Sequence, residues 1–391
     1  MTTEKILYPS LDTPAVLVDL VKLEANIKEM TELAAEAGVK LRPHTKVHES
    51  AMICKWQIEN GAHGIEVGPV AQAEAMVEEG INDIIVAHPF YGEHKLEILK
   101  RILAKKEVKI TVVVDMIEQA DSISRVGQAA GRKVPVAIKI DTSLEEGGLQ
   151  RFGVIPGEPT LALAKKLKRL PGVELVGIYA HEMGRDPTEE GRDRTAYKTA
   201  ETMARMAREL RDAGFQIEHV SVGATPTLRS TCRYKKEGKF PEITEIHPGH
   251  FVIGDMMYVS GGGETLEQCA VTVLTTAVST SHNEWAIIDA GYKTLGRDPL
   301  IGNQDKPGFS WNGMARMGVI KGRPDLFLGV LAAESGFLYY KDQKKKLNLG
   351  ERIEIVPNNV TEVINIHQQM YGIRNGKLEV VIPVTGRGRG N

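Results

Sequence analysis

The chain has 391 residues, of which 42% are hydrophobic and 26% are charged, as is typical of a globular protein with more than one domain. Its 49 Lys and Arg residues nearly balance its 51 Asp and Glu residues, for a formal net charge of −2. This balance gives no argument for nucleic acid or an anionic membrane as a partner, and we expect neither.

No stretch of the sequence approaches the roughly 18 consecutive apolar residues of a membrane helix, and the N-terminus lacks the pattern of an export signal. The three cysteines, Cys54, Cys232 and Cys269, have no CxxC spacing. They therefore indicate neither a disulfide framework nor a zinc site, and they fit a reducing compartment. We expect a cytoplasmic protein.

The first strand is expected at residues 14–20, and a helical pattern follows it and ends at Gly38. The same alternation then repeats. Strands are predicted at 64–67, 83–87, 108–114, 134–140, 173–179 and 217–222, with helices at 69–79, 94–105, 117–130, 159–169 and 194–213.

These strands are rich in Val and Ile, as strands buried on both faces of a parallel sheet are. About eight such units predict an α/β fold of the (β/α)8 TIM-barrel type. A doubly wound open sheet is the alternative, but no GxGxxG motif follows the first strand.

The pattern changes near residue 261. Short alternating strands are expected at 270–280, 285–289, 352–356 and 378–383, and no long helical pattern follows. We therefore predict a barrel domain over residues 1–260 and a mostly β domain over 261–391. The N-terminal strand is a candidate to join the second domain.

Lys46 lies between His44 and His48, where a short strand-like segment ends. In α/β proteins, the carboxyl ends of strands carry the chemistry. Desolvation and neighbouring cations lower the pKa of a lysine, and a neutral amine attacks carbonyl groups. We hypothesise that Lys46 forms a Schiff base with pyridoxal 5'-phosphate (PLP); a solvated lysine in a loop is the alternative.

Other candidates also follow predicted strands. Arg151 is suited to an anionic ring oxygen or a carboxylate, and a loop ion pair with Glu145 or Glu146 is the alternative, which we favour when the residue is taken alone. Tyr179 and His181 share one side of an extended chain and are expected to point into one cavity, unless they only cap the barrel core.

Small residues and hydroxyl groups after the strand 217–222 suit phosphate binding, and the candidates are Gly223, Ala224 and Thr225. The turn at Gly249 is a candidate to complete this site, and ordinary turns are the alternative in both places. Lys293 is a second Schiff-base candidate, which we rank below Lys46 because it lies outside the barrel pattern.

In their joint order these motifs resemble the fold-type III PLP enzymes, within them the D-serine dehydratase and D-threonine aldolase group, relatives of alanine racemase. The resemblance runs from Leu11 to about Gly386. The matching pieces are Leu11-Asp-Thr-Pro-Ala, Arg-Pro-His-Thr-Lys46, Arg151-Phe-Gly, Tyr179-Ala-His181, Gly-Ala-Thr-Pro-Thr227, His-Pro-Gly249 and Asp289-Ala-Gly.

The resemblance implies roles for these positions. Lys46 would be the PLP-bound lysine and the proton carrier at the substrate Cα, Arg151 would contact the phenolic oxygen, and Tyr179 would lie by the pyridine ring. The phosphate would be held by Gly223, Ala224, Thr225 and Gly249, and Tyr258 is counted with the cofactor-binding residues. The resemblance also implies a C-terminal β domain and a homodimer with shared active sites.

Enzymes of this group bind a divalent metal near the substrate β-hydroxyl, through a His and a Cys or Asp in a Pro-Asn-His-x-Cys-like motif. Here the motif reads Pro-Asn-Asn-Val-Thr, so Asn359 and Thr361 take the two ligand positions. Both are neutral and poor ligands for zinc or manganese, so we assign no metal ligand. His367, in an expected β-strand, is a weak remaining candidate.

We therefore predict a PLP-dependent lyase acting on a β-hydroxy D-amino acid or a close analogue, by dehydration or retro-aldol cleavage. Without a metal, another acid must protonate the leaving group, and the candidates are His181, His247 and Lys46. The alternative is a metal-free racemase or epimerase that uses Lys46 and a second base, such as His181 or a tyrosine of the partner subunit. A PLP-binding protein without turnover is a third reading, against which the β domain counts.

Overall fold

The computed structural model describes residues 7–143, 152–182, 186–300 and 308–390. These residues group into two compact units. The barrel unit comprises 27–249 and 388–390, and the β unit comprises 7–26 and 250–387. Residues 250–260, which we predicted to end the barrel domain, thus group with the β unit.

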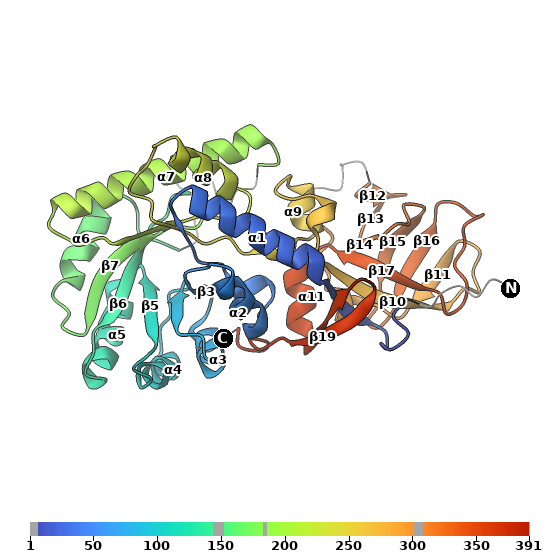
Figure 1. The fold of residues 1–391 in the computed structure, drawn as a ribbon, viewed down its shortest axis with the longest axis horizontal. Helices are drawn as coiled ribbons and strands as arrows, with labels where there is room; N and C mark the ends of the chain where they lie inside the picture. The colour runs from blue at the N-terminus through green and yellow to red at the C-terminus, as the bar shows by residue number, and fades with distance from the viewer. Residues whose placement is uncertain (1–6, 144–151, 183–185, 301–307, 391) are drawn as a thin grey trace. The chain divides into compact units, whose positions relative to one another are not determined.

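Eight parallel strands form the sheet of the barrel unit, and Figure 1 shows how this sheet curls. They are β2 (Lys40–Leu41), β3 (Ile65–Val67), β4 (Asp83–Val86), β5 (Lys109–Val114), β6 (Val134–Lys139), β7 (Val173–Tyr179), β8 (His219–Val222) and β9 (Glu245–Ile246). Each strand from β3 to β9 pairs with the next, and β9 pairs with β2. A parallel bridge between His44 and Glu66 and a hydrogen bond from the His63 N–H to the Leu41 carbonyl join β2 to the start of β3. The predicted (β/α)8 barrel is confirmed.

Helices lie on the outside of the curled sheet, and each strand from β2 to β8 is followed by one (Figure 1). They are α1 (Leu20–Glu36), α2 (Ala51–Glu59), α3 (Val70–Glu78), α4 (Glu93–Leu103), α5 (Ile117–Ala129), α6 (Glu158–Leu167), α7 (Glu189–Asp212) and α8 (Leu228–Lys236). Helix α4 illustrates the pattern: Leu96, Leu99 and Leu103 are buried at helical spacing, while Lys and Glu residues occupy its outer side. No helix among the described residues has both the length and the apolar character needed to cross a membrane.

The β unit is built on a nine-stranded sheet. Its strands are β1 (Ala15–Asp19), β10 (Val271–Ser279), β11 (Trp285–Ile288), β14 (Gly318–Ile320), β15 (Leu326–Leu331), β16 (Gly336–Tyr340), β17 (Arg352–Pro357), β18 (Gln369–Arg374) and β19 (Lys377–Pro383), and β12 (Ser310–Trp311) and β13 (Met314–Ala315) form a small separate pair. Strand β1 pairs antiparallel with β10 and parallel with β18, so the first strand of the chain belongs to this sheet. Three short helices accompany the strands: α9 (Met256–Ser260), α10 (Tyr292–Leu295) and α11 (Val360–Ile366).

One expectation for the β unit is wrong. We expected the segment before His367 to be a β-strand, but Val360–Ile366 forms helix α11 and His367 is its C-cap. The buried residues Val360, Val363 and Ile364 have the i, i+3, i+4 spacing of one helix face. The Nδ1 of His367 lies 2.6 Å from the Val363 carbonyl oxygen, a contact that ends the helix.

Candidate active site

A pocket with a cavity volume of about 70 Å³ opens at the carboxyl ends of the barrel strands. The chemically active side chains on its wall come from segments far apart in the sequence: His44, Lys46, His88, Lys139, Tyr179 and His181. The structure thus brings Lys46 into one pocket with Tyr179 and His181, the two residues that we expected to share a cavity.

Lys46 is placed by a short 3-10 turn, Thr45–Val47, directly after β2. The turn is capped by His44, whose Nδ1 accepts a hydrogen bond from the Lys46 N–H at 3.2 Å. Burial, together with the nearby Lys46 charge, lowers the pKa of His44 well below its ordinary value. His44 is therefore a neutral ring that fixes the backbone of Lys46.

Tyr179 ends β7 and is fully buried against the interior of the barrel. Its hydroxyl donates a hydrogen bond to Glu66 Oε1 at 2.9 Å, and its ring stacks on His247 with centroids 4.4 Å apart. The ring of His181 also stacks on His247, at 5.7 Å. Two pocket-wall side chains therefore share one buried histidine as their support.

His247 does not fit the role of an acid at the substrate. It is 1% exposed, and its Nδ1 lies 2.8 Å from the Ser221 hydroxyl. Burial is the main cause that lowers its pKa well below the ordinary value, so the ring is neutral. Among the described residues that line the pocket, His181 is present and His247 is not.

Sequence reasoning missed a second pocket lysine, Lys139 in β6. Its Nζ donates to the Ala87 carbonyl at 3.1 Å and lies 5.0 Å from the ring centre of Tyr179 and 5.2 Å from that of Phe152. The signal that was available is a single lysine in an otherwise apolar buried strand, Val134–Lys139. Glu66 could have been noticed in the same way, as a single charged residue between Ile65 and Val67 in the buried strand β3.

The proposed phosphate loop already binds an anionic side chain. The Gly223 N–H donates to Glu182 Oε2 at 3.0 Å, and the Thr227 hydroxyl donates to Glu182 Oε1 at 2.7 Å. Gly223 has φ +132°, a conformation that favours glycine, and Thr227 precedes the first residue of α8. In the structure these two donors bind a carboxylate. A phosphate group requires the same kind of N–H and O–H donors.

Gly249 is held against the Lys46 turn. A Cβ at this position would lie 3.0 Å from the His44 carbonyl oxygen, and the His44 N–H donates to the Pro248 carbonyl at 3.0 Å. Ala224 and Thr225 are buried in the loop that follows Gly223. The two glycines let backbone segments approach each other closely, since a Cβ at Gly223 would lie 3.2 Å from the His247 backbone nitrogen. The fit to the phosphate of PLP therefore rests on the Gly223 N–H and the Thr227 hydroxyl.

Of the remaining predicted residues, Arg151 lies outside the described part of the chain. Tyr258 belongs to the β unit, in α9, where its ring stacks on His250 at 4.0 Å. Lys293 is also in the β unit; it is exposed and pairs with Glu334 at 2.6 Å, an ordinary surface ion pair.

The two metal-motif positions serve a helix end. Asn359 is the N-cap of α11: its Oδ1 accepts the Thr361 N–H at 3.1 Å, and its Nδ2 donates to Asp298 Oδ2 at 3.2 Å. The Thr361 hydroxyl lies 3.3 Å from His250 Nε2. The described residues contain no group of three or more His, Cys, Asp or Glu side chains arranged to hold a metal ion. An amide that caps a helix and a neutral hydroxyl do not fit the donor chemistry of zinc or manganese.

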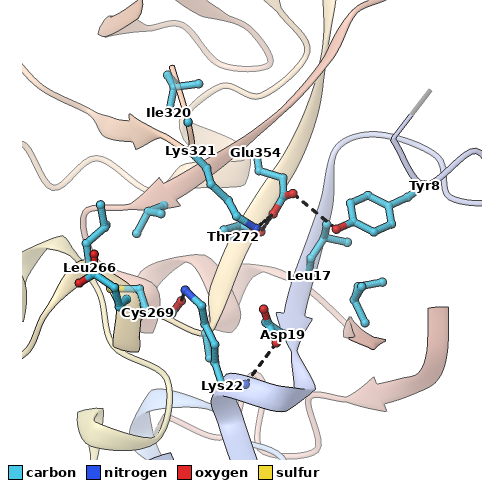
Figure 2. A pocket seen from close by; sticks show the side chains of 15 residues that line it. Tyr8, Leu17, Asp19, Lys22, Leu266, Cys269, Thr272, Ile320, Lys321 and Glu354 are labelled. Atoms are coloured by element: carbon cyan, nitrogen blue, oxygen red, sulfur yellow. Dashed lines mark hydrogen bonds and ion pairs between the residues drawn. The ribbon is translucent and has the colours of Figure 1, made fainter. Parts of the chain in front are cut away.

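A second hollow lies wholly within the β unit. Figure 2 shows the Glu354 carboxylate in this hollow accepting hydrogen bonds from Tyr8, at 3.4 Å, and Lys321, at 2.9 Å. The Lys22 ammonium donates to the Cys269 carbonyl at 3.2 Å. These charged groups are paired with protein groups of the same hollow, and we assign them a structural role.

A family model, the alanine racemase N-terminal domain, matches residues 18–256. The chain belongs to this family. A second model, described as a putative serine dehydratase domain, matches residues 270–373.

Members with named activities are similar along almost the whole chain. D-threonine aldolase of Arthrobacter sp is 27% identical over 384 residues, which cover 97% of this chain and 93% of the relative. D-threo-3-hydroxyaspartate dehydratase of Delftia sp. (strain HT23) is 29% identical over 359 residues, covering 90% and 91%. The crystal structure of D-threonine aldolase from Filomicrobium marinum superposes with a TM-score of 0.84 at 28% identity, covering 99% and 100%.

Proposed function

We propose that this protein is a PLP-dependent lyase that acts on a β-hydroxy D-amino acid or a close analogue. The observation that carries the proposal is the convergence of Lys46, Tyr179 and His181 on one pocket at the carboxyl ends of the barrel strands. The similarity to an aldolase and a dehydratase over at least 90% of the chain supports the same reading, because it includes both units.

In this proposal the barrel residues would hold the cofactor. Lys46 would bind its aldehyde carbon, the backbone of Gly223 and Gly249 and the residues Ala224 and Thr225 would hold its phosphate, and Tyr179 would lie by its ring. Arg151 and Tyr258 remain proposed cofactor contacts by resemblance. When bound, PLP withdraws electrons from the substrate Cα, which makes the bonds at that carbon easier to break.

Lys46 and His181 divide the proton transfers. In dehydration, Lys46 takes the Cα proton, the Cβ–O bond breaks, and His181 donates the proton that makes the leaving oxygen water. In retro-aldol cleavage, His181 accepts the β-hydroxyl proton, the Cα–Cβ bond breaks to release an aldehyde, and Lys46 returns a proton to Cα. Both routes need one group at Cα and one at the β-oxygen, which the two pocket residues supply.

We propose that this chemistry runs without a divalent metal. The support is the donor set at Asn359 and Thr361, which does not fit zinc or manganese and is engaged in capping α11. Assistance at the β-oxygen then falls to a protein side chain, for which His181 is the candidate on the pocket wall.

The same donor set favours a second candidate function, an amino-acid racemase or epimerase. Inversion requires only that the Cα proton be removed on one face and returned on the other, and makes no demand on the β-oxygen. Lys46 would serve one face and His181, or a tyrosine of a partner subunit, the other.

We also propose a homodimer with shared active sites, located in the cytoplasm. The family resemblance supports the first, and three buried free thiols at Cys54, Cys232 and Cys269 fit the second. Light scattering on protein eluted from a size-exclusion column measures the molar mass, which should be twice the 42.9 kDa of one chain. A fully active monomer would contradict the dimer.

Incubation of the holoenzyme with a panel of D- and L-amino acids tests the function. We expect keto acid and ammonia, or an aldehyde and a smaller amino acid, from β-hydroxy D-amino acids, with activity unchanged by EDTA. Inverted isomer as the only product would establish the racemase and overturn the lyase. No product from any amino acid would indicate a PLP-binding protein without turnover.

A further inference from the structure

Glu66 in β3 is an interior carboxyl directly behind the pocket wall, and neither Lys46 nor His181 needs it in the scheme above. Its side chain is fully buried. Oε1 accepts the Tyr179 hydroxyl at 2.9 Å and lies 3.5 Å from His44 Nε2. Oε2 lies 3.7 Å from His247 Nδ1 and has no hydrogen-bond partner among the described residues.

The groups that face Glu66 from the surrounding strands do not keep its pKa at the ordinary value of a carboxyl group. Burial raises its pKa to about 8, although the Tyr179 hydrogen bond and the charges of Lys139 and Lys46 act in the opposite direction. Glu245 in β9 adds a further upward contribution. A carboxyl in this setting gains and loses its proton close to neutral pH.

The two facing histidines cannot neutralise a carboxylate. Burial is the largest cause that lowers the pKa values of His44 and His247 well below the ordinary value, so both rings are uncharged. Their contacts with Glu66, at 3.5 and 3.7 Å, are longer than charge-assisted hydrogen bonds. Tyr179 is therefore the principal hydrogen-bond partner of Glu66.

The protonation state of Glu66 decides which way the Tyr179 hydroxyl points. A tyrosine hydroxyl has one proton to donate and lone pairs with which to accept. When Glu66 is ionised, that proton is directed to Oε1, and the tyrosine oxygen can only accept from any other partner. When Glu66 carries a proton, it can donate to the tyrosine oxygen and leave the Tyr179 proton free for another acceptor.

We propose that Glu66 is a positioning residue that acts through Tyr179, setting whether the Tyr179 hydroxyl accepts or donates a hydrogen bond toward the ring of bound PLP. An accepting hydroxyl favours a protonated ring nitrogen and stronger electron withdrawal, and a donating hydroxyl favours a neutral ring. The inference rests on the proposed function only in requiring PLP in the pocket; it requires no particular substrate.

The test is a spectroscopic pH titration of the substrate-free holoenzyme, with Glu66→Gln, Tyr179→Phe and the double variant. The visible band of the lysine-bound cofactor reports the protonation of the cofactor and its contacts. We expect Glu66→Gln to move the titration midpoint by about one pH unit or more. In the Tyr179→Phe background the same substitution is expected to add no further shift, because the link between the carboxyl and the pocket is gone.

Glu49→Gln is the matched control. Glu49 is buried, its pKa is raised to about 7 by burial, and its carboxylate accepts a hydrogen bond from Gln72 at 2.9 Å instead of from a pocket residue. Its substitution should leave the midpoint unchanged. Thermal melting of each variant shows whether it is folded. If Glu66→Gln does not fold, Glu66→Asp takes its place: a shifted midpoint upholds the role of Glu66, and an unchanged midpoint overturns it.

The outcomes separate this inference from the proposed function. A band that titrates identically in the wild type and in Glu66→Gln, or a shift that persists unchanged in the double variant, overturns the role of Glu66 and leaves the lyase intact. A normal Glu66 effect in a protein that turns over no amino acid upholds the inference and contradicts the lyase. A protein with no cofactor band contradicts both.

Discussion

Two regions contain buried histidine and carboxyl side chains but use them differently. One is the barrel pocket, and the other is a corner of the β unit formed by His250, Asp255, Asn359 and Thr361. In the barrel, the buried groups support a wall from which Lys46, Tyr179 and His181 face open space. In the β unit, Asp255 accepts the backbone N–H groups of Tyr258 and Val360, and so it caps one helix and anchors the start of another.

The comparison shows that titratable residues alone do not identify a reactive site. What distinguishes the barrel pocket is that several of its polar side chains line a cavity. The corner instead pairs its polar groups with one another, at and around the motif positions Asn359 and Thr361. The following predictions test this division from both sides.

Lys46→Ala should abolish catalysis, because no other group replaces the amine that binds the cofactor and moves the Cα proton. We expect a loss of at least about 10⁴-fold in kcat/KM. Steady-state assays on the active β-hydroxy D-amino acid measure it. Lys293→Ala, which removes the other lysine that we considered, should leave kcat/KM within about twofold, because exposed ion pairs contribute little. Equal losses in both variants would contradict the assignment.

The double substitution Asn359→His and Thr361→Cys should create metal affinity in the β unit. It replaces an amide and a hydroxyl by an imidazole and a thiolate, the donors that zinc prefers. Elemental analysis after dialysis against zinc should find one ion per chain in the variant. The wild type should hold none. Stoichiometric zinc or manganese in the wild type would show that the ligands lie elsewhere.

Asp255→Ala should destabilise the β unit without changing the barrel pocket. Its two oxygens accept the Tyr258 and Val360 N–H groups, both at 3.0 Å, and alanine leaves these donors without their partner. We expect a loss of about 2–3 kcal/mol in the free energy of unfolding, measured by urea denaturation. The cofactor band should persist under native conditions. The exposed Glu97→Ala should change stability by less than about 0.5 kcal/mol.

Glu66→Gln should flatten the pH dependence of stability. The folded-state pKa of Glu66, about 8, lies above the ordinary value of 4.5, so between these limits the folded state binds more protons than the unfolded state. The free energy of unfolding of the wild type therefore falls as pH rises through this window, by up to about 1.4 kcal/mol per pH unit from this group. Glutamine does not titrate and removes that slope. Urea denaturation of the wild type and the variant at about pH 5 and about pH 8 measures the free energies of unfolding. An equal difference between the two proteins at both pH values would mean that Glu66 is ionised in the folded state throughout this range.

Much of the barrel could be predicted from the sequence. Strands such as Lys109–Val114 and Val134–Lys139 are buried on both faces, and the runs of Val and Ile that this requires are visible without a structure. Lys46, Tyr179 and His181 could be assigned to one cavity because parallel strands present their carboxyl ends at one edge. This argument needs only the order of the strands.

The remaining features depend on contacts that leave no local pattern. Strands β2 and β9 have two residues each, too few for any periodicity. The pairing of Glu66 with Tyr179 joins residues 113 positions apart, and only closure of the barrel brings them together. Helix α11 was mistaken for a strand because seven residues rich in Val and Ile carry a β propensity that the N-cap at Asn359 overrides.

The central claim is that one amine at the mouth of the barrel binds the cofactor. Reduction of the holoenzyme with borohydride, followed by proteolysis and peptide mass spectrometry, fixes the cofactor to whichever lysine holds it. The account predicts a single modified peptide, with the pyridoxyl phosphate group on Lys46. Modification of Lys139 or Lys293 instead, or no modified peptide from protein prepared with PLP, would contradict it.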